Sequence, residues 1–364
     1  MRASATPMLS DLITSLLDVA FRRGGILGYH GISAGAPVPS PSMHVTQSRF
    51  REQIESLRSR YEVVPLHELV ARHQSARSID GLLAITFDDA YVGVARHAAP
   101  ILAELDVPAT IFVASEPSAE GAQFWWDQLE KARTTSPSEA FPAILAALGL
   151  PDLTPTEESV EKIREHLLAS HAGRAPRLLE SARLPLSPDL RAMSFEELRA
   201  LGADARFDFG CHTVTHAALP LLSAEEAHGE ITNGYRRLVD ELPRVRPILA
   251  FPFGLYDEDT VRTAEAAGMR AAVTLQGRGL TQHDHPLALP RLCVGEHRTV
   301  TSMRLRLNGG LRRVMISRDG SLHPFMPVEP FAAQSGGQRV MLPTKSPEAS
   351  APHRSSLEHS NEKV

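Results

Sequence analysis

Short apolar runs alternate with amphipathic stretches along most of this 364-residue chain. Apolar runs of about four to eight residues are typical of buried strands, and apolar positions spaced three and four residues apart are typical of helices. Because helices follow most of the strands, we expect an α/β fold with a parallel sheet or barrel. The pattern predicts strands at 25–30, 82–87, 107–113, 207–211, 247–251, 269–274 and 287–294, and helices at 47–60, 66–72, 92–105, 195–201, 224–241 and 258–267.

Three stretches depart from this alternation. Residues 115–190 show helical spacing and polar connections without a strand, which predicts a helical insertion of the kind that shapes a substrate site. An amphipathic stretch predicts an N-terminal helix at 1–24, packed on the domain or, alternatively, lying at a membrane surface. Residues 319–364 are rich in Pro, Ser and Gly and lack periodicity, so we expect a disordered tail after one domain at 25–318.

The composition limits the kinds of partner and the cellular compartment that we expect for this chain. The chain has 38 Lys and Arg against 43 Asp and Glu, so it lacks the basic excess of a nucleic-acid-binding protein. No run approaches the roughly 20 apolar residues of a membrane span, and the first stretch lacks the charge order of a secretory signal. Cys211 and Cys293 form no CxxC pair that would indicate a structural zinc site. We therefore expect a cytoplasmic protein without a transmembrane segment, and the oligomeric state stays open.

Two adjacent carboxylates, Asp88 and Asp89, directly follow the predicted strand 82–87. At the carboxyl end of a parallel strand, both can face one pocket, where a divalent cation would offset their repulsion. A turn with a helix N-cap is the plainer interpretation of such a pair, because Asp is common at both positions.

A second motif, HTVTH, places His212 and His216 four residues apart after the predicted strand 207–211. Two imidazoles at this spacing can bind one ion, although a chain with sixteen histidines also contains such pairs by chance. Together with Asp89 they form a three-ligand set that leaves a position for water, as in catalytic metal sites. Asp88 would then remain beside that water as a general base.

A third motif, FPFG at 251–254, ends the predicted strand 247–251. Pro252 fixes the backbone there, so the N–H of Phe253 could face a developing oxyanion. The motif is a weak signal, because a strand followed by Pro and Gly is an ordinary way to turn the chain.

TFDDA at 86–90, HTVTH and FPFG, in this order, resemble the polysaccharide deacetylase family, also called the NodB-homology domain or carbohydrate esterase family 4. The resemblance extends over roughly residues 25–294. It implies a deformed (β/α) barrel with one divalent metal, usually zinc, with cobalt or nickel as alternatives. By position, Asp89, His212 and His216 would bind this metal and Asp88 would be the base, in agreement with the motif-by-motif interpretation.

The sequence departs from the family pattern at three places. Ala90 stands where the family usually has Gly, a change that a backbone outside the left-handed region would tolerate. The usual Arg before the Pro motif is missing, and Arg291, near a late strand, is the candidate to orient Asp88. The usual late His is also missing, but LGYH at 27–30 is similar to the circularly permuted branch of poly-N-acetylglucosamine deacetylases, which suggests His30 as the general acid.

Alternatively, His30 has a purely structural role and the general acid is one of the late histidines, His283, His285 or His297. The resemblance implies a hydrolase that removes acetyl groups from an N-acetylated polysaccharide or oligosaccharide, for example in exopolysaccharide biosynthesis. An O-acetyl (xylan-type) esterase, a small-amide hydrolase of the same fold and a non-catalytic glycan-binding protein are the alternatives. We expect substrate contacts from four residues, with a core role as the alternative for one of the two tryptophans: Trp125, Trp126, Pro252 and Tyr29.

Overall fold

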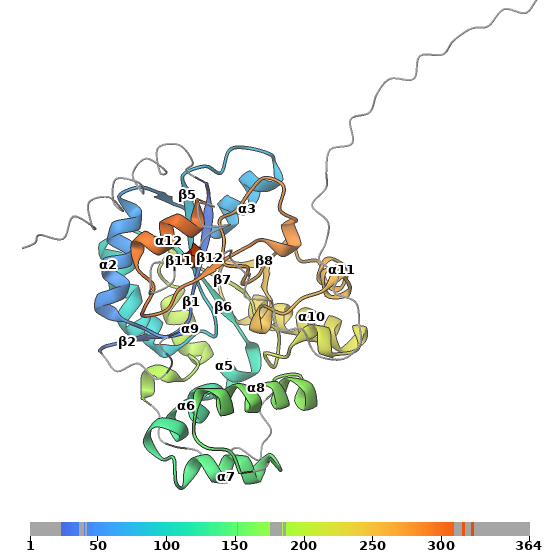
Figure 1. The fold of residues 1–364 in the computed structure, drawn as a ribbon. Coiled ribbons are helices and arrows are strands. Elements are labelled where there is room, and N and C mark those ends of the chain that lie inside the picture. Colours follow the sequence, from blue (N-terminus) through green and yellow to red (C-terminus); the bar gives the residue numbers. More distant parts are fainter. Residues whose placement is uncertain are drawn as a thin grey trace, which may run out of the picture.

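The central feature of the molecule is a curved parallel sheet surrounded by helices (Figure 1). The computed structural model describes residues 23–35, 40, 42–150, 152–174, 184 and 187–308, and two short strands at 315–316 and 322–323. Its strands are β1 Gly25–Tyr29, β2 Ile32–Ser33, β3 Val45–Thr46, β4 Glu62–Val63, β5 Leu82–Phe87, β6 Ala109–Val113, β7 Phe207–Cys211, β8 Val245–Ala250, β9 Ala271–Val273, β10 Leu292–Cys293, β11 Met315–Ile316 and β12 Leu322–His323.

The main sheet has eight strands in the order β10-β1-β5-β6-β7-β8-β9, with β4 paired to the start of β5, and all its pairs are parallel. One segment joins its two edges. Leu289 forms a parallel bridge with Val273 of β9, and Leu292 a few residues later pairs with Leu27 of β1. The sheet therefore curls into a half-barrel, with all strand carboxyl ends at one rim, and this confirms the expected (β/α) barrel type of fold.

Helices cover the outside of the half-barrel, and several start with a side chain that accepts a backbone N–H. Ser194 and Ser223, for example, form capping boxes with Glu197 and Glu226. The helices are α2 Gln47–Arg58, α3 Leu66–Gln74, α4 Ala99–Glu104, α5 Ser115–Glu120, α6 Trp125–Thr135, α7 Ala140–Ala147, α8 Glu157–His171, α9 Phe195–Leu201, α10 Ala224–Glu241, α11 Glu258–Ala266 and α12 Val300–Leu307.

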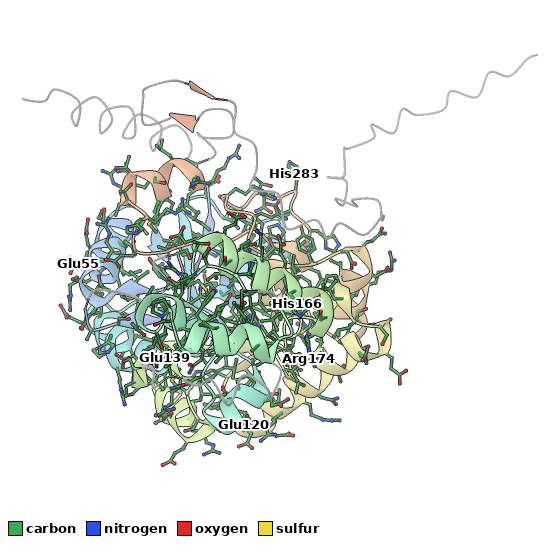
Figure 2. All side chains as sticks on the ribbon, turned by 60° about the horizontal axis from the view of Figure 1, so that its bottom comes forward. Glu55, Glu120, Glu139, His166, Arg174 and His283 are labelled. Carbon is green, nitrogen blue, oxygen red and sulfur yellow. The ribbon has the colours of Figure 1, made fainter. Side chains whose placement is uncertain are left out.

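Helices α5 to α8 form the predicted insertion, and α6, α7 and α8 share an apolar cluster of their own. This group lies at one end of the half-barrel (Figure 1), and the view of Figure 2 brings it forward, with Glu139, His166 and Arg174 labelled. Because Trp126 of α6 packs against His216, the insertion lies over the carboxyl ends of the strands. The insertion therefore covers the end of the sheet where parallel α/β proteins build their sites.

Two predicted elements differ from the structure because of proline. The predicted helix 92–105 opens as a π-helical turn at Val94–Ala98, just before Pro100, which has no N–H to donate to the helical ladder. The predicted strand 287–294 is strand only at Leu292–Cys293, because Pro290 interrupts the pairing and Pro286–Ala288 forms a 3₁₀ turn.

The predicted terminal segments are largely untested. Residues 1–22 of the expected N-terminal helix, and the expected tail apart from Leu322–His323, lie outside the described residues. Within the described part of the chain, no helix has the length and apolar character needed to span a bilayer.

Candidate active site

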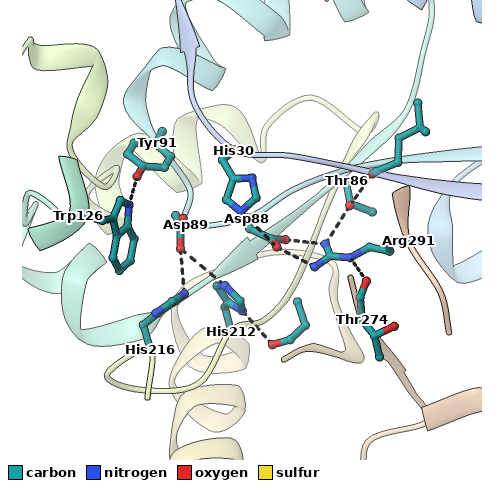
Figure 3. Close-up of polar contacts among 12 residues, drawn as sticks. His30, Thr86, Asp88, Asp89, Tyr91, Trp126, His212, His216, Thr274 and Arg291 are labelled. Carbon is teal, nitrogen blue, oxygen red and sulfur yellow. Dashed lines mark hydrogen bonds and ion pairs between the residues drawn. The ribbon is translucent and has the colours of Figure 1, made fainter. Parts of the chain in front are cut away.

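Residues of TFDDA, LGYH and HTVTH meet at the carboxyl rim of the sheet, as Figure 3 shows. Asp88 and Asp89 follow β5, His30 follows β1, and His212 follows β7. The chain turns sharply after Asp88, because Asp89 takes a φ of 64°. This left-handed turn is why two consecutive carboxylates can serve one pocket instead of facing opposite sides of a strand.

The expected backbone at Ala90 is wrong. We expected a conformation outside the left-handed region, but Ala90 has a φ of 52° and is fully buried. A Cβ in this region costs roughly 1–2 kcal/mol, which Gly avoids. The Ala that departs from the family pattern therefore stands in a strained turn that the surrounding structure holds in place.

Asp89, His212 and His216 form a cluster whose possible ligand atoms all lie within 4.8 Å of one another. Asp89 Oδ1 lies 3.6 Å from His212 Nε2 and 3.3 Å from His216 Nε2. The Nδ1–H of His212 donates to the carbonyl of Ala250 at 2.8 Å, which leaves the lone pair of Nε2 facing Asp89. This is the tautomer and orientation that a metal-binding histidine needs.

The electrostatics of this cluster also fit a cation. Burial, reinforced by neighbouring Asp88 and Asp127, raises the pKa of Asp89 well above its usual range. Burial lowers the pKa of His212, and burial together with His212 lowers the pKa of His216 well below its usual range. Asp89 Oδ1 has no hydrogen-bond partner although it is buried. A divalent ion would satisfy this orphaned oxygen and two neutral imidazoles at once, so the residues present fit such an ion.

Asp88 is held by a buried arginine. Arg291 is fully buried, and its Nη1 and Nη2 donate to the two carboxylate oxygens of Asp88 at 2.6 and 2.7 Å. Nη1 also donates to Thr86 Oγ1 at 3.1 Å, and Nε donates to the carbonyl of Thr274 at 3.3 Å. Burial opposes the charge of Asp88, but Arg291 outweighs it and holds the pKa of this carboxyl below its usual range. The structure thus places Arg291 where it orients the predicted base.

His30 is the histidine that lies beside this pair. Its Nε2 is 3.9 Å from Asp88 Oδ2, and the residue is 8% exposed. Burial lowers the pKa of His30 to about 4, although Asp88 opposes the shift. The late histidines, in contrast, are all exposed, at positions 283, 285 and 297.

Two aromatic side chains, Trp126 and Phe253, lie next to the cluster, and we call them the aromatic wall. The ring of Trp126 lies 5.0 Å from that of His216 and 6.0 Å from that of Phe253, and Phe253 lies 4.7 Å from His216. Phe253 has a φ of 58°, and Pro252 before it is buried in the 3₁₀ turn after β8. Trp126, Phe253 and His216 thus share one side of the site.

Trp125 and Tyr29 do not lie where a substrate contact requires. Trp125 is 5% exposed, belongs to the apolar cluster of the insertion, and its indole N–H donates to the carbonyl of Gly173. Tyr29 is fully buried and packs against Phe50 and Phe87 on the outer side of the sheet. The expected substrate contacts of these two residues are therefore wrong, because neighbouring residues along a strand or helix point in different directions.

One buried network was missed at the sequence level. Asp127, fully buried on α6, accepts a hydrogen bond from Tyr91 Oη at 2.7 Å and lies 2.6 Å from His44 Nε2. Tyr91 Oη in turn accepts the indole N–H of Trp126 at 2.8 Å. A carboxylate on the apolar side of an otherwise amphipathic helix was the available signal. The network fixes the indole that packs on His216.

The rim of this parallel half-barrel thus carries a possible metal site, formed by one Asp and two His, beside a carboxylate that is held by an arginine. More specifically, the model of the family described as polysaccharide deacetylase matches residues 76–139 and 162–272. The chain belongs to this family of enzymes. The matched segments contain both Asp motif residues and both motif histidines, whereas His30 and Arg291 lie outside them.

Solved structures share the fold at low sequence identity. A deacetylase of Streptococcus pyogenes, PplD, in complex with acetate is 16% identical, with a TM-score of 0.53 over 79% of this chain and 99% of that one. IcaB from Ammonifex degensii is 16% identical, with a TM-score of 0.52 over 79% and 97%. A polysaccharide deacetylase from Bacillus cereus is 16% identical, with a TM-score of 0.50 over 79% and 69%. A sequence comparison with curated proteins gives no match.

Proposed function

We propose that this chain is a divalent-metal-dependent hydrolase that removes acetyl groups from an N-acetylated polysaccharide or oligosaccharide. The observation that carries the proposal is the buried set of Asp89, His212 and His216 directly beside Asp88, whose two oxygens are held by Arg291. Asp89 Oδ1 is buried and has no hydrogen-bond donor, so it can bind an ion without losing a hydrogen bond. The family gives the reaction class, and PplD, with acetate bound, is a relative in fold.

Asp89, His212 and His216 would hold the ion, and two nitrogen donors with one carboxylate oxygen form a donor set that suits zinc. When bound, a divalent ion makes water more acidic and polarises an acyl oxygen. We propose that Asp88 accepts the proton of the attacking water, since its carboxylate is ionised and fixed by Arg291. The water oxygen then forms the bond to the acetyl carbon.

The proton has a defined route to the leaving group. Because Arg291 makes Asp88 a weak base, we infer that Asp88 passes its proton on to His30 Nε2, 3.9 Å from Oδ2. His30 is uncharged in the free site, since burial lowers its pKa to about 4, so it can take up this proton during the reaction. It then protonates the amine nitrogen as the bond between carbon and nitrogen breaks. Acetate and a free amine on the sugar are the products.

The aromatic wall would hold the substrate. We propose that Trp126 and Phe253 pack against the acetyl group or sugar ring, and that the Phe253 N–H donates to the oxyanion. Pro252 supports this turn, since its ring fixes the backbone immediately before Phe253.

The test is acetate release with added zinc or cobalt from a panel of N-acetylglucosamine polymers, peptidoglycan and acetylxylan. We expect release from an N-acetylated glycan, and an Asp88→Asn enzyme that retains metal should lose at least about 100-fold in rate. Asp80→Asn, an exposed residue on the loop before β5, is the matched control and should keep the wild-type rate. Unchanged release by Asp88→Asn would refute the mechanism, and release from acetylxylan alone would point to the O-acetyl esterase.

The ligand assignment has a separate test. A His212→Ala, His216→Ala double variant should lose stoichiometric metal in equilibrium dialysis, because two of three protein ligands are gone. Full metal occupancy in this variant would refute the assignment whatever the activity of the enzyme.

A further inference from the structure

Glu230, a buried carboxylate outside the Asp-His-His cluster, accepts hydrogen bonds from the loop that carries both histidines. Glu230 lies on α10 and is 7% exposed. Its Oε2 accepts the backbone N–H groups of Val214 and Thr215, each at 2.9 Å, and its Oε1 accepts the hydroxyl of Thr215 at 2.7 Å. We call residues 212–216 the histidine loop. One side chain of α10 thus accepts three hydrogen bonds from this loop.

The histidine loop adopts a conformation that it would not keep alone. Thr213 has a φ of 68°, which is rare for a β-branched residue, and His216 has a φ of 60°. The carbonyls of Thr213 and Val214 accept the N–H groups of Ser115 and Glu116 at the start of α5. With Glu230 on the N–H side and α5 on the carbonyl side, the strained turn is held from both directions.

Helix α10 comes unusually close to this loop. A Cβ at Gly234, one turn after Glu230, would lie 2.8 Å from the carbonyl carbon of Thr213. The absence of a side chain at Gly234 therefore permits the approach that brings the Glu230 carboxylate within reach of the loop.

Arg174 connects Glu230 and the histidine loop to the helical insertion. It follows α8, and its Nε donates to Thr215 Oγ1 at 3.0 Å while Nη2 donates to Glu230 Oε1 at 3.1 Å. Thr215 Oγ1 thus accepts from Arg174 and donates to Glu230. The side chain of Arg174 is 38% exposed and that of Glu230 only 8%, so the arginine lies over the carboxylate and shields it from solvent.

We propose that Glu230 is a positioning residue that presets His212 and His216 for the metal, and that Arg174 couples the insertion to this function. The inference rests on the proposed function only in assuming that these histidines bind the ion. The hydrogen bonds described for Glu230 go to Val214, Thr215 and Arg174 and not to the side chains of the cluster, so it acts through the loop that carries the histidines. The metal-free loop is thereby already in the binding conformation.

The expected effects are graded by how many hydrogen bonds to the loop each variant removes or weakens. Glu230→Gln keeps the shape but removes the charge, and it should weaken zinc binding about 10-fold, whereas Glu230→Ala should approach 100-fold. Arg174→Gln should cost less than Glu230→Gln, since the loop N–H groups keep their acceptor. In metal-free protein, hydrogen exchange of a peptide covering 212–217 should speed up in the Glu230 variants.

The experiment measures the zinc dissociation constant by competition with a chromophoric chelator, alongside hydrogen exchange and thermal unfolding of the metal-free proteins. Glu225→Gln, the same change at an exposed position of α10, and Arg164→Gln, which pairs with Glu161 on the outside of α8, are the controls. Both should match the wild type. Thr215→Val removes the hydrogen bonds that the hydroxyl makes with Glu230 and Arg174 and keeps the two backbone N–H groups, so it tests the contact between Glu230 and the loop if Glu230→Ala fails to fold.

The outcomes separate the two proposals. If the wild-type protein binds no zinc, the proposed function fails. If the wild type binds zinc and folded Glu230→Gln binds it within twofold with unchanged exchange at 212–217, the positioning role of Glu230 is overturned. Weaker binding with faster exchange at the histidine loop, and unchanged exchange elsewhere, supports it.

Discussion

The buried ion pair of Arg291 and Asp88 can be tested through protein stability. If the pair is broken, the loss in the free energy of unfolding should depend on pH with a predictable sign. Arg291→Met removes the guanidinium and keeps an apolar chain of similar length in a fully buried position. Asp88, only 2% exposed, then loses the bidentate partner that compensates its charge, and the neighbouring His30 is neutral. Breaking a buried pair in this way costs about 3–5 kcal/mol.

The pH dependence follows from the pKa of Asp88. In the wild type this pKa lies below the ordinary value of 3.8, so the pair's stabilisation is complete above about pH 4 and is lost only as the pH falls through the folded pKa. In Arg291→Met, burial alone should raise the pKa above its ordinary value. If the pKa rises by about three units, the variant loses about 4 kcal/mol more between pH 4 and pH 7, at 1.36 kcal/mol per unit.

The assay is urea unfolding of metal-free wild type and variant at several pH values between 5 and 8. The difference in the free energy of unfolding should grow with pH, and an Asp88→Asn, Arg291→Met double variant should be more stable than the single variant at pH 8. Arg51→Met breaks the exposed bidentate pair with Glu104 and should show little loss and no pH trend. A loss for Arg291→Met that is independent of pH would refute the reasoning.

Three further predictions concern the site. His30→Gln should lower kcat about 100-fold with metal retained, whereas exposed His297→Gln should not change it; equal rates would contradict the proton route. Asp127→Asn should lower kcat/KM by roughly 10- to 100-fold with zinc stoichiometry unchanged, because the indole packed on His216 loses its support; a wild-type value would contradict this. Since burial lowers the pKa values of His212 and His216, bound zinc should survive below pH 6 in a release titration, and loss near pH 6.5 would contradict it.

Local patterns predicted the main elements and the members of the Asp-His-His cluster. The strand at 82–87 and the helices at 195–201 and 224–241 lie where the apolar spacing places them. Because parallel strands present their carboxyl ends at one rim, motifs directly after strands are brought together even when they are far apart in the chain. Asp89 and the two histidines of HTVTH were accessible to sequence analysis for this reason.

Side-chain direction was less accessible. Trp125 and Trp126 are neighbours of the same type, yet one fills the core of the insertion and the other packs on His216. Tyr29 and His30 diverge in the same way at the end of β1. Which of two adjacent residues reaches the site depends on how the whole element is rotated against its neighbours, and residue type alone does not specify this.

The sequence by itself determined the α/β architecture, the helical insertion and the residue types able to bind a metal, because these follow from local periodicity and from motifs at strand ends. Only the tertiary structure decided the left-handed turn at Ala90, the pairing of Arg291 with Asp88 and the grip of Glu230 on the histidine loop. These contacts join segments separated by many residues, for example 203 between Arg291 and Asp88. Their formation depends on the curvature that brings β10 beside β1 and α10 against the rim, and no local pattern encodes that distance.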